Sequence, residues 1–312
     1  MPTNVWVGGE SANAGEAGNW SEGLPEADQD IIVPSYATYG ITSGMTAISG
    51  IALKSFWVQD GFSGNIGNNS GGFLQIDISG SGASQFLYEG NSTTAKFHFV
   101  KTLDTVPIEI RKTGVGNTGQ PAFQMITNDV SSPSTNMGIV SIYSGEVYLG
   151  PEMKSCELGG VVVGSNGGQS SPVVMMGVGC RSEAADAILP FVTVNHGYVD
   201  LQTGVDDLNH YGGETNLSGG SVADLNLYGG TVKLNNPTGA AGGNVIVKLN
   251  LRGGVFDNTE NPTQKTITNA DLHSGTIRDP AGELTWTNPV VYKNKMTDVT
   301  ADFGPERTVT IA

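Results

Sequence analysis

The sequence predicts an all-β chain folded as a single-stranded parallel β-solenoid (β-helix), and three observations support this prediction. Glycine makes up 45 of the 312 residues, whereas charged residues are only 14%. This composition suits short strands joined by tight turns and suits long helices poorly. In the second half of the chain a phrase of alternating apolar positions around a glycine recurs. The spacing of its copies is typical of the coils of a solenoid.

Each copy of the phrase has apolar residues at every second position, a glycine turn, and a second alternating run. Period-two alternation marks a half-buried strand, and the central glycine marks a bend in the chain. Each copy therefore predicts two short strands joined by a turn. The copies are Val140–Leu149, Val192–Leu201, Leu208–Leu217, Leu225–Leu234, Leu249–Asp257 and Ala270–Arg278.

The central glycines of the last five copies follow one another at irregular steps. In sequence numbers these steps are 16, 17, 24 and 21. Irregular steps of about 20 residues suit stacked coils, in which insertions enter at the loops while the strands stay in register. A hairpin sandwich, the less favoured alternative, would show turns roughly every 8 to 12 residues without a shared phrase. These glycines are Gly197, Gly213, Gly230, Gly254 and Gly275.

The chain divides into three predicted segments. Residues 1–34 predict an N-terminal cap, because Trp6 and Trp20 lie beside tight turns and can bury large apolar faces where there is little other core. Residues 35–280 are the predicted solenoid body. Residues 281–312 are the predicted C-terminal tail. We expect this tail to cap the last coil or to mediate oligomerisation, since a solenoid has apolar edges at both ends.

Less regular elements are predicted outside the repeated phrase. In the first half of the body, strands are expected at 48–53, 73–78 and 96–100, with turns rich in glycine, asparagine and serine between them. A last strand is expected at 308–311. No segment predicts a convincing helix, and residues 182–189 could form two turns at most.

The charge balance disfavours several classes of partner. The chain has 15 basic and 30 acidic residues, a formal net charge of −15. Nucleic acids and anionic membranes both attract positive charge, so neither is expected to bind. A partner with a basic patch, or solubility alone, fits this charge better. No apolar stretch is long enough to cross a bilayer, so no membrane span is predicted. The opening Met1–Asn4 has no basic or apolar segment of a signal peptide, and we expect folding in a cytoplasm.

Glycoside hydrolysis is the one enzymatic activity for which the sequence offers residues. It needs two positioned carboxylates, and the nearest set is Asp206 and Asp207 with His196 and His210. The set is similar to the adjacent aspartates and Gly-His-Gly of polygalacturonases. However, the order is reversed, no Arg-x-Lys follows, and that family's Asn-Thr-Asp has only 127–129 as a counterpart. We interpret the aspartates as a solvated loop and the histidines as neighbours of glycine turns, and we predict no catalytic residue.

No metal or cofactor site is predicted. Asp28 and Asp30 could contribute to a structural calcium site, but no calcium-loop repeat accompanies them. The glycine pairs at 229–230 and 253–254 precede strands, without the helix N-terminus that phosphate binding requires. The histidines show no metal-ligand spacing and the cysteines form no C-x-x-C. The four histidines are His98, His196, His210 and His273.

Two cysteines and several aromatic residues leave alternatives open. Cys156 and Cys180 are expected to be buried free thiols, with a disulfide between them as the alternative. Phe56 and Trp57, and the phenylalanines within 97–99, could stack on sugars. Core positions are the favoured interpretation, because aromatic residues on strands usually pack inside.

The opening segment carries a distinctive motif. It consists of Trp6–Gly9, Asn19-Trp20, Gly23–Pro25 and Asp28–Pro34. The motif resembles the W-x-G-G…N-W…G-x-P…D-x-[IV]-[IV] opening found ahead of β-helical repeats in phage virion proteins and bacterial surface proteins. This opening covers about a tenth of the chain, and the L-x-L-x-G-G-x-[VI] coils extend the resemblance over about half. The resemblance implies a β-helix with an N-terminal cap.

The resemblance also implies a function. Bacterial surface members normally carry a signal peptide, whereas virion proteins need none because they assemble inside the host. We therefore expect a non-enzymatic virion structural protein: a homotrimeric head decoration or cement protein on the capsid surface, bound to the major capsid protein. The alternative is a tail spike or fibre that binds host surface glycan. A glycan-cleaving β-helix enzyme is less favoured still.

Overall fold

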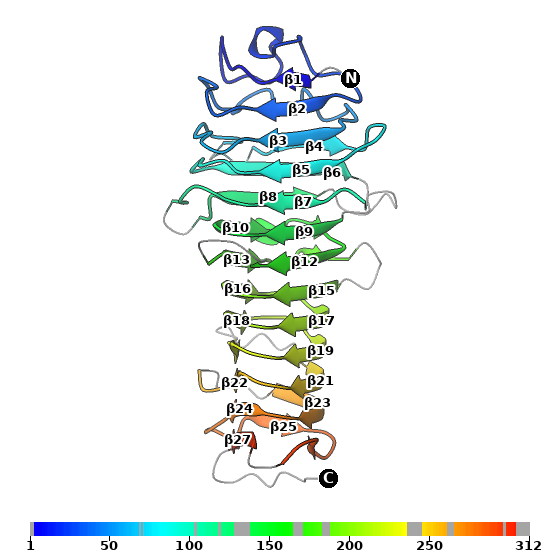
Figure 1. Ribbon diagram of the computed structural model, residues 1–312, viewed down its shortest axis with the longest axis vertical. Coiled ribbons are helices and arrows are strands. Elements are labelled where there is room, and N and C mark those ends of the chain that lie inside the picture. The colour runs from blue at the N-terminus through cyan, green and yellow to red at the C-terminus, as the bar shows by residue number, and fades with distance from the viewer. Residues whose placement is uncertain are drawn as a thin grey trace.

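The computed structural model has the predicted fold class: an all-β rod of stacked parallel coils (Figure 1). The coils follow one another along the rod from β1 (Thr3–Val5) at one end to β27 (Val299–Asp302) at the other. The structure describes residues 3–68, 70, 72–102, 105–117, 120–127, 138–164, 171–182, 188–235, 245–260, 265–295 and 298–303.

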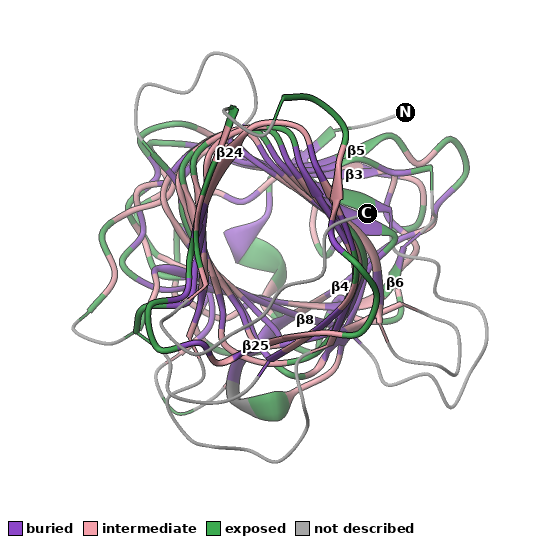
Figure 2. Cartoon of the chain, turned by 90° about the horizontal axis from the view of Figure 1, so that it is seen from below, coloured by how far each residue is buried: buried purple, intermediate pink, exposed green. Residues whose placement is uncertain are grey.

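Two long sheets run along the rod and enclose the core, as the view down the long axis shows (Figure 2). In the first sheet, neighbouring strands pair in parallel. Its order is β1, β2 (Asp30–Val33), β3 (Ser55–Val58), β5 (Gln85–Tyr88), β7 (Ile108–Ile110), β9 (Ile139–Ile142), β12 (Gly160–Val163), β15 (Leu189–Val194), β17 (Val205–His210), β19 (Val222–Leu227), β21 (Val245–Leu251), β23 (Lys265–Leu272) and β25 (Leu284–Trp286), with β26 (Val291–Tyr292) also paired to β23.

The second sheet supplies the other long strand of most coils, again in parallel pairs. Its order is β4 (Leu74–Ile78), β6 (Ala95–Thr102), β8 (Phe123–Thr127), β10 (Glu146–Leu149), β13 (Val173–Met176), β16 (Tyr198–Leu201), β18 (Glu214–Leu217), β20 (Thr231–Leu234), β22 (Val255–Asp257), β24 (Gly275–Arg278) and β27.

Two smaller features complete the described secondary structure. A minor sheet of two parallel strands, β11 (Cys156–Glu157) and β14 (Cys180–Arg181), lies between the long sheets in the middle of the chain. Within the described residues the helical elements are two short 3-10 helices, η1 (Ala17–Asn19) and η2 (Pro151–Met153). Residues 183–187, the centre of the weak helical segment considered above, lie outside the described residues.

The predicted register of the repeats is confirmed. Val205, Val222, Ile246 and Ile267 are successive partners across four strands of the first sheet. The steps in number between them are 17, 24 and 21, the same as those between the central glycines. The extra residues of the longest step lie between β20 and β21, outside both strands, and the strands stay aligned.

The central glycines align in a column at one corner of the rod. Their backbone is left-handed, which explains why glycine occupies this position in each coil. Gly230, for example, has φ +72°, a conformation that costs little only in glycine. A Cβ atom there would lie 2.5 Å from the carbonyl oxygen of Gly213 in the preceding coil. The adjacent amide of Thr231 donates to that same oxygen, at 2.9 Å. The recurring glycine therefore lets each turn stack closely on the one before.

The core consists of inward side chains that align from coil to coil. Alternate residues of each strand point inward, and nearly all of them are apolar and buried. Aliphatic residues dominate the C-terminal half, whereas aromatic rings fill the first coils. Phe97 packs its ring 5.0 Å from that of Phe86 and 5.5 Å from that of Phe123, centroid to centroid. Such continuous ladders give the rod one core along its length.

The first coils depart from one prediction and agree with two. The segments 73–78 and 96–100 lie in β4 and β6 as expected. Residues 48–53 are not a strand: turn hydrogen bonds such as that from Ile51 N to Ile48 O (3.2 Å) occupy this segment. The strand begins after it, at β3. The alternation at 48–53 instead reflects two buried side chains, Ile48 and Leu53, on either side of a turn.

Both ends of the rod continue the long sheets. Strands β1 and β2 open the first sheet within residues 1–34, and the indoles of Trp6 and Trp20 pack edge to face there at 5.0 Å. Each indole N–H reaches a backbone carbonyl, of Tyr39 and Ala14 respectively. At the other end, β25 to β27 extend both sheets, while the expected strand at 308–311 lies outside the described residues.

Candidate functional site

The structure separates the residues that most resembled a glycosidase site. Asp206 and Asp207 are exposed on the outer side of β17, whereas His210, on the same strand, points into the core and has no exposed surface. His210 Nδ1 donates to the carbonyl oxygen of Gly229, at 2.7 Å. Because the sheet lies between the aspartates and the histidine, these groups cannot act on one substrate. Asn128 and Asp129 lie outside the described residues.

Burial and neighbouring charge affect the titration of this strand. Partial burial, followed by the negative charges of Asp206 and Asp224, raises the pKa of Asp207. Asp207 and Asp224 are register partners, so their carboxylates lie on the same outer column. Burial lowers the pKa of His210. Partial burial and the neighbouring carboxylates thus explain the raised pKa of Asp207 without a catalytic partner.

The two aspartates near the N-terminus do not share a site either. Asp28 has φ +60° and accepts a hydrogen bond from the backbone amide of Ser81. Asp30 accepts one from the Ser55 hydroxyl, at 2.6 Å, and lies 3.7 Å from the Lys54 ammonium. Both carboxylates therefore hold local structure. In the described part of the chain, no group of three or more His, Cys, Asp or Glu side chains is arranged to hold a metal ion.

The aromatic residues considered as sugar platforms are mainly core residues. Phe56, Phe97 and Phe99 are buried, and their rings belong to the cluster that fills the first coils. Trp57 is half-buried, and its indole N–H donates to the Glu89 carboxylate, at 3.0 Å. The favoured core interpretation is therefore confirmed for the three phenylalanines.

The outer side of the second sheet carries the surface best suited to a partner. We call it the contact face. It spans β10, β13, β16 and β18, whose outward positions align from strand to strand. One column reads Glu, Val, Tyr, Glu and the next reads Tyr, Met, Asp, Asn. Tyrosine and methionine are enriched at protein interfaces. The eight residues are Glu146, Val173, Tyr198, Glu214, Tyr148, Met175, Asp200 and Asn216.

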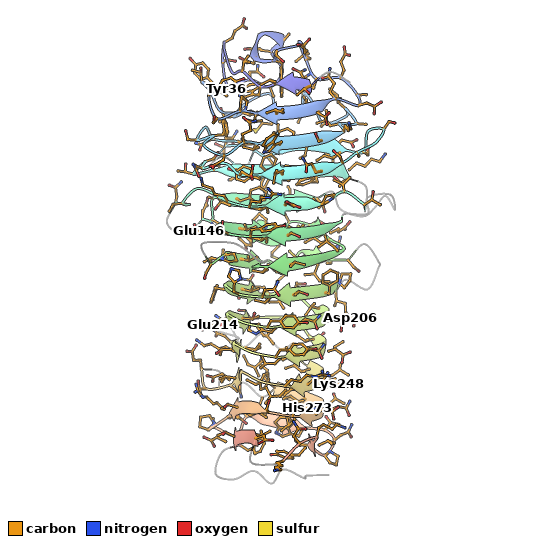
Figure 3. The ribbon with its side chains drawn as sticks, in the orientation of Figure 1. Tyr36, Glu146, Asp206, Glu214, Lys248 and His273 are labelled. Atoms are coloured by element: carbon orange, nitrogen blue, oxygen red, sulfur yellow. The ribbon has the colours of Figure 1, made fainter. Side chains whose placement is uncertain are left out.

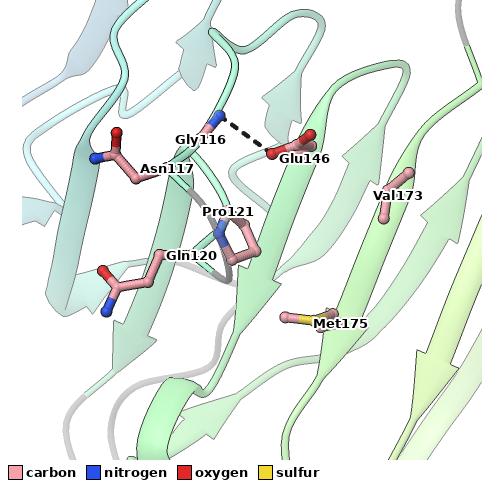
Figure 4. A pocket seen from close by; sticks show the side chains of 7 residues that line it. All are labelled: Gly116, Asn117, Gln120, Pro121, Glu146, Val173 and Met175. Atoms are coloured by element: carbon pink, nitrogen blue, oxygen red, sulfur yellow. Dashed lines mark hydrogen bonds between the residues drawn. The ribbon is translucent and has the colours of Figure 1, made fainter.

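A hollow of about 380 Å³ opens at one end of the contact face (Figure 4). Val173, which is 40% exposed, and Met175 supply apolar surface, and the Glu146 carboxylate lies beside them. The backbone amide of Gly116 donates to Glu146 Oε2, at 3.1 Å, and orients this carboxylate. The other residues that line the hollow are Asn117, Gln120 and Pro121.

The eight residues of the contact face include three acidic side chains and no basic one. In the described part of the chain, Glu146 and Asp200 form no ion pair with a basic side chain, and Asp200 accepts hydrogen bonds from Gln202 and Ser218 instead. Glu214 is paired with Lys233, at 3.0 Å. Burial, and then the charge of Asp200, raises the pKa of the Tyr198 phenol. This surface therefore favours a positively charged partner.

The opposite side of the rod has a different character. Glu146 and Glu214 project from one edge, whereas Asp206, Lys248 and His273 project from the other (Figure 3). On the outer side of the first sheet, asparagine amides of successive coils bond to one another: Asn226 donates to Asn209, at 3.1 Å, and Asn250 donates to Asn226, at 2.8 Å. Because these amides hydrogen-bond to one another, fewer of their donors and acceptors remain for a ligand.

A stacked pair of tyrosines lies beside the asparagines. The rings of Tyr211 and Tyr228 are 4.6 Å apart and nearly parallel, and the guanidinium of Arg252 lies 5.5 Å from the centre of Tyr228. Since these faces cover one another, the column is better explained by stacking between coils than by stacking on a sugar. His273 follows Arg252 at the next coil.

Comparison of the chain with protein-family models, with curated proteins and with solved structures finds no match in any of the three. None of the described residues forms an apolar helix long enough to cross a lipid bilayer.

The sequence did not point to the contact face. Its members come from four strands whose loops differ in length, so their alignment becomes apparent only when the register is known. The sequence held a partial indication of this face. In two copies of the repeated phrase the outward positions are equivalent: Glu146 and Tyr148 in one copy correspond to Tyr198 and Asp200 in the other.

Proposed function

We propose that this protein is a non-enzymatic structural component of a phage particle. In this role it decorates or braces the head as a homotrimer, and its main partner is the major capsid protein. The N-terminal motif and the glycine-containing coils are the basis for the phage setting, as argued from the sequence. The proposal requires a surface that can bind another protein.

The contact face is the observation that carries the proposal. Its tyrosines, its exposed Val173 and its half-buried Met175 offer apolar area, while Glu146 and Asp200 offer charges that a basic partner can neutralise. An arginine side chain suits the hollow, because its methylenes can pack on Val173 and Met175 while its guanidinium reaches Glu146. The net charge of −15 would steer such a partner toward the chain.

The continuous core supports the same role. Long parallel sheets that share one apolar interior resist bending, and each coil is held by its two neighbours. In the set that most resembles a catalytic site, the first sheet separates His210 from Asp206 and Asp207. A continuous core and coils that support one another suit a protein that acts as a rigid spacer or brace.

Co-sedimentation with the particle tests the proposal. Particles lacking the protein are mixed with purified wild-type chain or with Val173→Lys, which places a charged side chain on the contact face. We expect the wild type to sediment with the heads and the variant to bind at least tenfold more weakly. Tyr36→Lys is the matched control, because Tyr36 is 72% exposed and lies far from the contact face (Figure 3). Failure of the wild-type chain to bind would contradict the proposal.

A further inference from the structure

Cys156 and Cys180 are direct register partners in the minor sheet. Both are free thiols, and neither has exposed surface. Paired strands lie about 4.8 Å apart, which is inside the range of about 4.4–6.8 Å over which a disulfide can join two Cα atoms. Both side chains point into the same apolar core. The two cysteines therefore occupy aligned, buried positions of consecutive coils.

A glycine lies beside the two cysteines. Gly150 lies against both of them: a Cβ atom there would be 3.1 Å from Cys180 Sγ and 3.3 Å from Cys156 Cβ. The Cys180 thiol also donates to the carbonyl oxygen of Leu149, at 3.1 Å. Burial, and then the neighbouring thiol, raises the pKa of Cys180. In the folded protein the Cys180 thiol therefore stays protonated and reacts slowly.

The minor sheet is expected to open more easily than the two long sheets. It has two strands, whereas the long sheets have 14 and 11. It is flanked by η2, where Met153 is 80% exposed and has φ +63° although it is not a glycine. Short sheets beside exposed turns open at lower free energy than the interior of long ones. Such opening gives a small oxidant access to the thiols.

We propose that Cys156 and Cys180 are an oxidation site that forms a disulfide between consecutive coils. A small disulfide such as oxidised glutathione is the oxidant. The thiolate of one cysteine attacks it, forming a mixed disulfide and releasing one glutathione thiolate. The second cysteine, its register partner on the neighbouring strand, then attacks the mixed disulfide and releases the other glutathione. The two cysteine thiols lose two protons and two electrons, and one oxidised glutathione becomes two reduced molecules.

The disulfide would cross-link two consecutive coils in the middle of the rod. It joins two adjacent coils and so restricts the unfolded chain between the two cysteines. The Glu157–Arg181 ion pair (3.1 Å) spans the next register position and holds the same two strands together in the reduced protein. The inference does not depend on the particle location proposed above.

Mass spectrometry of the full-length protein tests the site. The chain is incubated at pH 8 with oxidised glutathione and then digested without reduction. We expect the intact mass to fall by two hydrogen atoms, a cross-linked peptide pair containing Cys156 and Cys180, and a melting temperature raised by several degrees that a reductant reverses. The variants Cys156→Ala and Cys180→Ala are the matched controls, and each is expected to retain at most one glutathione adduct and to form no cross-link.

A second incubation tests the site even if the fully folded protein excludes the oxidant from the two buried thiols. It uses a denaturant concentration just below the unfolding transition, where local opening is frequent, and it counts free thiols with an alkylating reagent after complete unfolding. Loss of both thiols in monomeric wild-type chain supports the site. Two thiols that remain free, or a disulfide only between separate chains, would overturn it.

Discussion

His210 and Leu227 are register partners on β17 and β19, and both are completely buried on the inner side of the first sheet. The partner in the following coil, Leu251, is also buried. A histidine thus interrupts an aliphatic ladder. Its Nδ1 bonds to Gly229, but among the described residues Nε2 has no hydrogen-bond partner. This mismatch leads to two predictions about stability.

Replacing His210 with leucine is expected to stabilise the protein. The substitution removes a buried polar atom without a partner and restores the residue type found at Leu227 and Leu251. A gain of about 1–2 kcal/mol in the free energy of unfolding is expected. Chemical denaturation at pH 7.5 measures it. A loss of stability would mean that the hydrogen bond to Gly229 stabilises the fold by more than the unpartnered Nε2 destabilises it.

Stability is expected to fall at acidic pH partly because of His210. Burial lowers the pKa of this group in the folded protein, so between the folded pKa and about 6.5 the unfolded chain binds more protons. The His210 contribution to stability is therefore complete above about pH 6.5, decreases as the pH falls below it, and levels off below the folded pKa. Denaturation of wild type and His210→Leu from pH 7.5 to 4.5 checks this. Parallel curves for the two proteins would contradict it.

The glycine column is expected to tolerate no side chain. Gly230→Ala forces a left-handed alanine and places Cβ 2.5 Å from the Gly213 carbonyl oxygen. We expect a loss of at least about 2 kcal/mol in the free energy of unfolding. Gly50→Ala is the matched control, because a Cβ atom there meets no neighbour within 4 Å. Equal effects of the two substitutions on the midpoint of denaturation would contradict this stacking.

The aromatic cluster is expected to be the most sensitive part of the first coils. Truncating Phe97 to alanine should cost about 3–5 kcal/mol, since its ring is fully buried among other rings. Tyr36→Ala, at a residue 72% exposed, should change stability by less than about 0.5 kcal/mol. Thermal unfolding of the two variants compares them. The rings within 6.0 Å of Phe97 belong to Phe56, Phe86, Tyr88 and Phe123.

Much of the fold could be predicted because short turns keep the repeated phrase visible. From β15 to β20, strands in successive coils are joined by a few residues, and both strands of each coil were predicted. Strands β12 and β13 were missed because the chain between them is longer and their apolar runs show little alternation. The burial of His210 was foreseeable, since Leu-Asn-His at 208–210 aligns with Leu-Asn-Leu at 225–227.

The candidate site was less predictable than the fold. Alternation in a strand shows that Glu146 and Tyr198 lie on the outer side, but it does not show that Val173 lies between them. That alignment depends on the register that each loop permits. The pairing of Cys156 with Cys180 has the same origin: they are 24 positions apart in the sequence, and only the path of the coil places them on neighbouring strands.

Cryo-electron microscopy of the native particle would show where this chain lies, and so whether it is a component of the phage head. We expect rod-shaped density that repeats over the head at three-fold or quasi-three-fold positions, with the contact face against the capsid protein. Density confined to the tail would make host recognition the leading function. Absence of the chain from the particle would contradict the proposed function and leave the solenoid fold unchanged.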